Sequence, residues 1–286
     1  MSTDPTTDHS PLPPTEQSGA HGALESASVA DLIGWMHKTD GDVHQAVGAA
    51  LPALEKFIEA LVPRMAAGGR LFYIGAGTSG RLGIVDASEC PPTFGVHPDR
   101  VVGLIAGGDG AIREAVEGAE DDPAGAWRTL QTLGIQDSDS LLGIAASGRT
   151  PYVIGGLSSA RQHGLLTGAI VCNPDSAVAA AAEHPIEAIT GPEFVTGSTR
   201  LKAGTATKLL LNMISTVTMI QLGHVQGNRM VDMKPANAKL MERGSRMIAE
   251  ELGVGLEKAG ELLEQHASVR EALKHARSKK KRGDHA

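Results

Sequence analysis

The chain has 286 residues, a mass of 29.6 kDa and a formal net charge of −7, since 33 Asp and Glu residues outnumber 26 Lys and Arg residues. This length predicts one or two domains. An acidic chain with only four Phe, two Tyr and two Trp residues lacks the clustered cations and stacking aromatics of a nucleic-acid binder. No run of 18 apolar residues occurs, so we expect neither nucleic acid nor a membrane as a partner.

The N-terminal part of the chain changes character near residue 22. Residues 1–22 are polar and proline-rich and contain no apolar core of a signal peptide, so we expect them to be disordered. Residues 29–36 and 43–65 follow with helical apolar spacing and predict two or three helices. Cys90 and Cys172 form no CxxC motif or disulfide framework, which favours a reducing, cytoplasmic location.

Short apolar runs then alternate with helical segments, such as residues 111–120 and 151–163. The five runs are residues 70–74, 101–106, 140–145, 166–172 and 186–189. Alternation of this kind predicts an α/β fold with a mainly parallel sheet covered on both faces. Ligands of such sheets bind outside the carboxyl ends of the strands, so the loops at those ends are the first candidates for a site.

From residue 201 onward the pattern is helical. Helices are predicted at residues 201–223, 237–251, 256–266 and 269–276. We therefore divide the chain into a disordered segment (1–22), an α/β domain with its preceding helices (23–225), a C-terminal helical region (226–277) and a solvated basic tail (278–286).

The first apolar run leads into a glycine-rich turn. GAGTSG at residues 75–80 fits the dinucleotide fingerprint GxGxxG, which is a weak signal alone. The acid that this fingerprint requires after the second strand is missing, because that run ends in two glycines and only Asp109 lies beyond them. The hydroxyls of Thr78 and Ser79 at a helix start suit a compact monophosphate instead.

A second hydroxyl-rich turn follows the third run, where residues 146–151 read ASGRTP. An alternative explanation for Ser147 and Thr150 is that they are helix-capping residues, a common role for Ser and Thr. Two such turns at strand ends of one sheet favour a sugar-phosphate site more than either turn does alone.

Candidate acid–base groups are two glutamates. Glu89 lies just before Pro91-Pro92, and Glu120 lies in the acidic cluster EGAEDD at residues 117–122. Paired carboxylates supply an acid and a base, but both residues also fit an ordinary solvated surface, and spacing alone does not bring them together. Arg200 and Lys202 are candidates for neutralising an anion.

Metal-ligand spacing is absent from the sequence. His184 and His224 have no partner at such spacing, and we predict no metal site.

The motifs together resemble the N-acetylmuramic acid 6-phosphate etherase family, a branch of the sugar isomerase (SIS) domain proteins. The matching stretches are residues 70–83, 86–95, 117–122, 143–152, 172–174, 191–193, 196–206, 212–216 and 230–232. The likeness runs from about residue 46 to about residue 273, and its motifs are long and specific. The resemblance implies an SIS-type three-layer α/β sandwich, with N-terminal helices and a small C-terminal helical appendix.

The resemblance also implies a reaction. The D-lactyl ether of N-acetylmuramic acid 6-phosphate is cleaved with water to N-acetylglucosamine 6-phosphate and D-lactate, by C2 deprotonation, elimination and rehydration, with no cofactor. The family's two glutamates fall on Glu89, the acid at the lactate oxygen, and Glu120, the C2 base. Its phosphosugar-binding loops fall on residues Thr78, Ser79, Ser147, Gly148 and Thr150.

The family resemblance further implies a homodimer with sites close to the subunit interface. One departure concerns the N-terminus, where the family's Thr-Glu-x-Arg-Asn-Pro is replaced by TEQSGAHG at residues 15–22.

The residues alone leave three alternative functions open. A non-catalytic sugar-phosphate sensor needs the hydroxyl turns but not both glutamates. An aldose–ketose isomerase shares C2 proton abstraction but needs a route for the proton to C1. A nicotinamide oxidoreductase is disfavoured by the missing acid.

Overall fold

A parallel five-stranded sheet forms the centre of the protein. The structure is a computed structural model that describes residues 12–266 and 268–283. The strand order is β2-β1-β3-β4-β5, and every pairing is parallel. The strands are β1 (Leu71–Gly75), β2 (Val101–Ile105), β3 (Ser140–Ile144), β4 (Leu166–Val171) and β5 (His184–Glu187).

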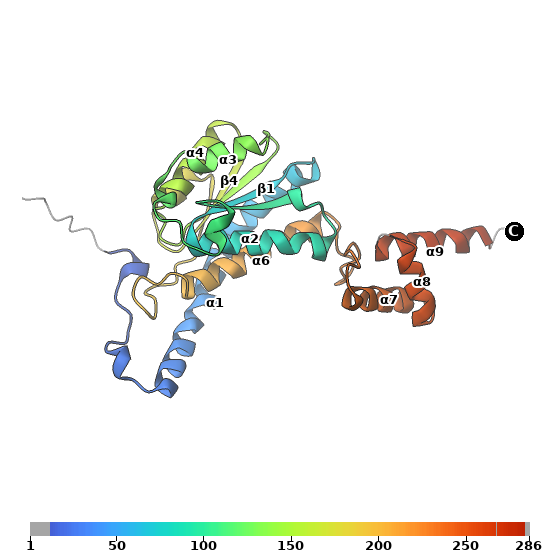
Figure 1. Cartoon of the computed structure of the whole chain (residues 1–286), viewed down its shortest axis with the longest axis horizontal. Helices are drawn as coiled ribbons and strands as arrows, with labels where there is room; N and C mark the ends of the chain where they lie inside the picture. Colours follow the sequence, from blue (N-terminus) through green and yellow to red (C-terminus); the bar gives the residue numbers. More distant parts are fainter. Residues whose placement is uncertain (1–11, 267, 284–286) are drawn as a thin grey trace, which may run out of the picture.

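Helices cover both faces of this sheet, which confirms the predicted three-layer sandwich (Figure 1). One face packs against α1 (Val29–Ala66), α2 (Gly77–Phe94) and α6 (Lys202–Gln221). The other packs against α3 (Gly125–Thr132), α4 (Pro151–Gln162) and α5 (Ala177–Ala181). Strands buried on both faces need apolar residues at successive positions, and β1, β3 and β4 are buried along their whole length.

The first helix differs from the prediction of two or three helices. Residues 29–66 form one continuous helix, α1, capped at its start by the Ser28 side chain, which accepts the N–H of Asp31. The polar stretch between the two apolar segments contains no proline to end the helix. That stretch is instead solvent-facing, and Asp42 within it pairs with Lys202 of α6.

The helix predicted at residues 111–120 is wrong. Two short 3-10 turns, Asp109–Ile112 and Ala119–Asp121, take its place. Ala111 is the only buried residue of that stretch, so it has no apolar face to pack, and Gly108 and Gly118 adopt positive φ angles of 73° and 71° before the two turns. The result is an open loop after β2.

The two ends of the chain also differ from the prediction. Residues 1–11 of the segment predicted to be disordered lie outside the described residues. Pro14–Glu16 form a 3-10 turn with Thr15 fully buried, a specific contact where composition predicted disorder. At the other end α9 (Val269–Gly283) is helical into the predicted basic tail, and residues 284–286 lie outside the described residues.

A small helical unit follows the sheet domain and is set apart from it in Figure 1. It contains α7 (Ala238–Leu252), α8 (Leu256–Glu264) and α9 around its own apolar core. Asp232 joins the unit to the end of α6, because its carboxylate accepts from Arg270 of α9 at 2.6 Å and lies 3.1 Å from His224 Nδ1. Within the described residues, no helix is long and apolar enough to cross a membrane.

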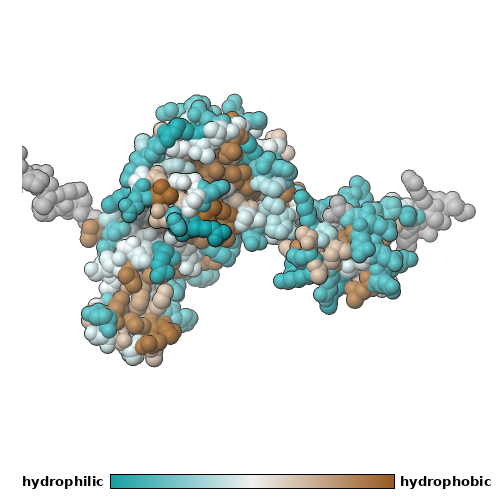
Figure 2. Space-filling model, in the orientation of Figure 1, coloured by the Kyte–Doolittle hydropathy of each residue, from teal (hydrophilic) through white to brown (hydrophobic). Residues whose placement is uncertain are grey.

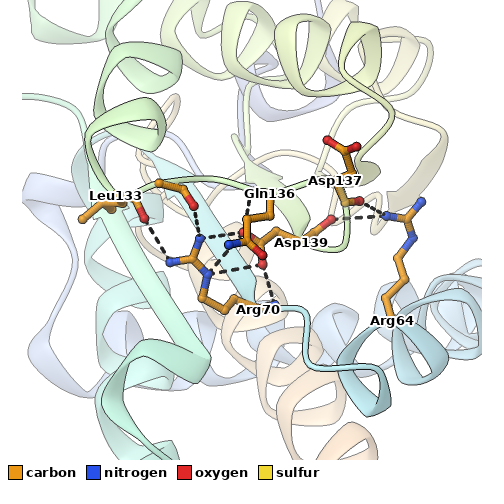
Figure 3. Close-up of polar contacts among 7 residues, drawn as sticks. Arg64, Arg70, Leu133, Gln136, Asp137 and Asp139 are labelled. Carbon is orange, nitrogen blue, oxygen red and sulfur yellow. Dashed lines mark hydrogen bonds and ion pairs between the residues drawn. The ribbon is translucent and has the colours of Figure 1, made fainter.

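A buried carboxylate ties together the amino ends of β1 and β3 (Figure 3). Asp139 is 1% exposed, and its oxygens accept the backbone N–H of Arg70 at 2.8 Å, that of Gln136 at 2.9 Å and the Arg70 guanidinium at 2.7 Å. The same guanidinium donates to the carbonyls of Leu133 and Gly134. One buried carboxylate therefore accepts from two backbone N–H groups and a guanidinium at the base of the central strand pair.

This network predicts a stability effect. Asp139→Ala leaves two backbone donors without their acceptor and removes the anionic partner of the Arg70 guanidinium, and we expect the free energy of unfolding to fall by ~2–4 kcal/mol. Urea unfolding followed by circular dichroism measures it. Glu242→Ala is the control, because it removes an exposed acid from the Arg246 pair and should cost at most ~0.5 kcal/mol. Equal effects of the two substitutions would contradict this account.

Candidate active site

The candidate site lies where the order of strands in the sheet reverses. From β1 the chain crosses to β2 on one side and then to β3 on the other side of β1. The helices that follow β1 and β3 lie on opposite faces, α2 with α1 and α6, and α4 with α3 and α5. A switch point of this kind is where open α/β sheets bind ligands. The two hydroxyl-rich turns predicted from the sequence flank it.

The turn after β1 brings backbone unusually close to backbone. A Cβ at Gly75 would lie 2.7 Å from the Gly80 nitrogen, and Gly77 adopts a positive φ of 51°. Thr78 and Ser79, both partly buried, fall in the first turn of α2. The first N–H groups of a helix have no intrahelical acceptor, and no side chain caps α2. Hydroxyls and N–H groups are thus presented together, as anion binding requires.

The turn after β3 depends on Gly148. This residue has a φ of 71°, and a Cβ there would collide with the Ser176 side chain. The Ser147 hydroxyl accepts the N–H of Arg149 at 3.3 Å within the turn. Thr150 occupies the N-cap position of α4, yet its side chain makes no cap hydrogen bond. The capping explanation therefore fails for Thr150.

A third segment at the same edge leads into α6. Thr78 lies against this helix, since its Cγ2 would be 3.7 Å from a Cβ at Gly204. The helix start is capped by Glu193, a fully buried residue whose two oxygens accept the N–H groups of Lys202 and Ala203 at 2.9 and 3.0 Å. Lys202 is buried and donates to Asp42 at 3.1 Å, so its ammonium is engaged by the protein rather than free for an anion, while Arg200 is exposed.

The two glutamates lie far apart within one chain. Glu89 is twelve residues after Gly77 in α2, about 18 Å along the helix axis, and it is exposed. Because α2 runs back toward the amino ends of the strands, Glu89 lies at the edge opposite the hydroxyl turns. Glu120 is exposed in the loop after the carboxyl end of β2.

The sheet also separates these glutamates. The α2 helix belongs to the core on one face, whereas Ala119, next to Glu120, packs with the core on the other face. A cavity of about 550 Å³ beside the Glu120 segment is lined by the end of β2, Tyr152 and Asp122. One chain alone therefore does not bring Glu89 and Glu120 to a common pocket.

A buried carboxyl lies one helical turn before Glu89. Asp86 accepts hydrogen bonds from the Tyr73 hydroxyl and the Ser215 hydroxyl, both at 3.0 Å. Burial raises the pKa of Asp86 to about 6, against the lowering effect of these two hydrogen bonds. The residue ties α2 to β1 and α6, and so fixes the helix that carries Glu89.

Both cysteines of the chain are buried. Burial raises the pKa of Cys90 and that of Cys172 to about 12, so both thiols stay protonated at neutral pH. Among residues 12–266 and 268–283, no three His, Cys, Asp or Glu residues are grouped to hold a metal ion.

Sequence reasoning did not single out Asn173 and Glu193. Asn173 donates to the carbonyls of Ala146 and Ser147 and so braces the second hydroxyl turn. Both residues stand in stretches that carry the family resemblance, at residues 172–174 and 191–193. Only their contacts identify what they do.

Comparison with known proteins identifies the family. A protein named N-acetylmuramic acid 6-phosphate etherase from Christiangramia forsetii is 56% identical over 261 residues, covering 91% of this chain and 95% of the relative. A Bacteroides fragilis protein of the same name is 54% identical and covers 91% of this chain and 92% of its own. The chain belongs to the N-acetylmuramic acid 6-phosphate etherase family. The resemblance inferred from the motifs is confirmed.

Two broader comparisons agree on the fold. The model of the glucokinase regulatory protein N-terminal SIS domain matches residues 53–161 of this etherase-family chain. A solved Bacteroides fragilis structure, described as a phosphosugar isomerase involved in capsule formation, superposes with a TM-score of 0.54 at 21% identity. It covers 70% of this chain and 95% of its own.

The buried Asp86 predicts a pH effect on stability. Its pKa is about 6 in the folded chain and 3.8 as the ordinary value, so between these values the folded state binds more protons and the free energy of unfolding falls as pH rises. Asp86→Asn stays neutral and keeps both hydroxyl partners. We expect its unfolding free energy to gain ~2–3 kcal/mol relative to the wild type between about pH 4 and about pH 7.

Urea unfolding at a series of pH values tests this expectation. Asp137→Asn, a change at an exposed acid, controls for the loss of one surface charge and should follow the wild-type curve. Parallel curves for Asp86→Asn and the wild type would contradict a raised pKa at Asp86.

Proposed function

We propose that this chain cleaves the D-lactyl ether of N-acetylmuramic acid 6-phosphate with water, releasing N-acetylglucosamine 6-phosphate and D-lactate. The observation that carries the proposal is 56% identity to an etherase over nearly the whole of both chains. Two hydroxyl turns at the β1/β3 switch point, with helix starts behind them, support binding of the sugar phosphate. The reaction would serve recycling or catabolism of cell-wall amino sugars.

In the proposed mechanism the sugar opens to its aldehyde, which acidifies the C2 proton. Glu120 removes this proton as the base, the C3–O bond breaks, and a C2=C3 double bond forms. Glu89 protonates the departing lactate oxygen. Water then adds across the double bond, with hydroxyl at C3 and hydrogen at C2. The substrate carbonyl serves as the electron sink, and Thr78, Ser79, Ser147, Gly148 and Thr150 hold the phosphate and sugar.

This mechanism needs a second copy of the chain. Glu89 and Glu120 lie at opposite edges and on opposite faces of the sheet, so we infer that Glu89 of the partner subunit meets Glu120 in a homodimer. Apolar surface supports such an interface. Leu51, Val217 and Ile220 of α1 and α6 are 43%, 37% and 44% exposed, beside a groove of about 690 Å³ between these helices.

Further apolar surface lies on the projecting N-terminal end of α1 (Figure 2). Val29 and Ile33 there are 73% and 65% exposed, and Val85 of α2, one turn before Glu89, is 55% exposed. Both α1 and α2 pack against α6, and contiguous exposed apolar surface is typical of sites that bind another protein. A closed twofold dimer formed through the surface of α1, α2 and α6 would bring Glu89 of one subunit to the site of the other.

A cytoplasmic location is also inferred. Both cysteines are free and buried, which is typical of proteins from reducing compartments.

The alternative is a sugar-phosphate sensor without catalysis. The match to the glucokinase regulatory protein SIS domain is the observation in its favour. That match spans only residues 53–161, and a sensor has no need of Glu89 and Glu120 together. Turnover therefore separates the two functions.

The direct test is incubation with N-acetylmuramic acid 6-phosphate and assay for released D-lactate. The etherase releases D-lactate and N-acetylglucosamine 6-phosphate in equal amounts. Binding of the substrate without lactate release would contradict the etherase activity and favour the non-catalytic sensor.

The base role of Glu120 is tested by isotope exchange. Glu120→Ala should abolish exchange of the substrate C2 hydrogen with solvent deuterium, because that step precedes bond cleavage, whereas Glu89→Ala should retain it. Mass spectrometry of the recovered sugar measures the exchange. Glu117→Ala, in the same acidic cluster, serves as the control. Normal exchange in Glu120→Ala would assign the base elsewhere.

Mixed dimers test the shared site. Glu89→Gln and Glu120→Gln should each be inactive, but a refolded equimolar mixture should regain about a quarter of wild-type activity, since half of the dimers are mixed and each has one intact site. The rate of D-lactate release by the mixture measures the regained activity. A mixture as inactive as its parents would show that both glutamates act from one chain.

A further inference from the structure

The N-terminal arm, residues 13–17, makes specific contacts with the body of the protein. Thr15 is 0% exposed. Its backbone N–H donates to Asn173 Oδ1 at 3.1 Å, and its hydroxyl accepts from Asn173 Nδ2 at 2.8 Å. These residues are 158 positions apart in the chain. A reciprocal, fully buried pair of this kind fixes the arm at one point.

The partner of Thr15 belongs to the candidate site. Asn173 follows the carboxyl end of β4, and its amide also donates to the carbonyl of Ala146 at 3.3 Å and that of Ser147 at 3.2 Å. One side chain therefore holds both the arm and the hydroxyl turn after β3. Displacement of the arm removes one of the partners that orient this amide.

The arm, together with Gly19 just after it, also reaches a second wall of the site. Glu16 Oε2 would lie 3.3 Å from a Cβ at Gly197, in the loop that leads to α6. Gly19 approaches the carbonyl of Glu193 so closely that a Cβ there would lie 2.7 Å from it. The segment from Thr15 to Gly19 thus bridges the loops after β3 and β4 and the segment before α6.

A cavity exists between the arm and the hydroxyl turn. Its volume is about 470 Å³, within the range of small-molecule sites. Pro13, Pro14 and Gln17 form one side of it, and Ser147, Arg149 and Ser176 form the other. The cavity has walls on both sides only because the arm is in place.

We propose that residues 13–17 form a wall of the phosphosugar site and that Thr15, through Asn173, is the positioning residue that holds this wall. The proposal rests on the proposed function, since it takes the hydroxyl turns as the phosphosugar site. The arm-closed state is the binding-competent one, so anything that lowers its population raises the apparent dissociation constant by the same factor. Binding of the sugar in turn favours the closed arm.

The test uses Thr15→Val in the full chain. Valine keeps the shape and the backbone N–H but loses the hydroxyl that accepts from Asn173. We expect the KM for N-acetylmuramic acid 6-phosphate to rise about three- to tenfold, the effect of one lost hydrogen bond on closure, with kcat within about twofold. Thr15→Ser restores the acceptor and should return KM to within about twofold of the wild type. A kcat loss at unchanged KM, or no rescue by serine, would overturn the proposal.

The matched control is Thr167→Val. Thr167 is also fully buried, and its hydroxyl accepts one hydrogen bond, from the N–H of Glu183 at 3.0 Å. It lies in β4 away from the arm. A KM increase in this variant equal to that of Thr15→Val would mean that loss of any buried threonine hydroxyl loosens the site, which would overturn a specific role of Thr15.

Hydrogen exchange provides a readout that needs no turnover. N-acetylglucosamine 6-phosphate should slow amide exchange at residues 15–17 of the arm, the part of it that carries backbone N–H groups, as well as in residues 147–150 of the wild type. Without ligand, Thr15→Val should exchange faster than the wild type in the arm. Protection of residues 147–150 alone would overturn the proposal.

The two readouts separate this proposal from the proposed function. If the wild type releases no lactate but the phosphosugar protects the arm and the turn together, the etherase activity is wrong and the arm still forms the wall of a phosphosugar site. If lactate is released and the arm shows no protection, the arm proposal is wrong and the etherase activity stands.

Discussion

The parallel pairing of β1 with β3 is the constraint on which the site depends. It places the carboxyl ends of two strands side by side where the chain changes direction. The two hydroxyl turns, separated by some seventy residues of sequence, become neighbours only through this pairing. Asp139 stabilises the opposite end of the same pair by accepting from Arg70. A loss of register between β1 and β3 would therefore displace both turns at once.

Parallel α/β architecture also explains why Glu89 and Glu120 lie far apart within one chain. A helix that follows a strand runs back to the edge from which the strand came, so each added turn of α2 moves its residues away from the hydroxyl turn that starts it. A loop residue such as Glu120 stays near the edge at which its strand ends. Within one chain, Glu89 late in α2 and Glu120 in the loop after β2 therefore lie apart. The proposed dimer is thus a requirement of the topology combined with the proposed chemistry.

Much of this architecture was predictable because its signals are local. The five apolar runs gave the strands to within two residues, and the glycine turns marked the strand ends, since positive φ at Gly77 and Gly148 and close approach at Gly75 are properties of a few neighbouring residues. The helix predicted at residues 111–120 shows the limit of apolar periodicity as a signal. The segment has helical spacing, but it has no apolar face to pack, and Ala111 alone among its residues is buried.

Long-range contacts were not predictable from the pattern. Thr15 lies in a segment whose composition is that of a disordered chain, yet it pairs with Asn173, a residue 158 positions away. Likewise, nothing in the spacing of Lys202 reveals that Asp42 engages it or that Glu193 caps its helix. The resemblance to a family supplied the roles of Glu89 and Glu120, which residue spacing left open.

The Glu193 cap has a consequence for where a phosphate can bind. Three helices, α2, α4 and α6, begin at the same edge of the molecule, and each start attracts anions through its free N–H groups. The fully buried Glu193 carboxylate already accepts the first N–H groups of α6 and adds a negative charge there. In contrast, the starts of α2 and α4 have no side-chain cap. In the proposed phosphosugar site, a phosphate dianion would therefore be disfavoured at the start of α6 and favoured at the two uncapped helix starts beside Ser79 and Thr150.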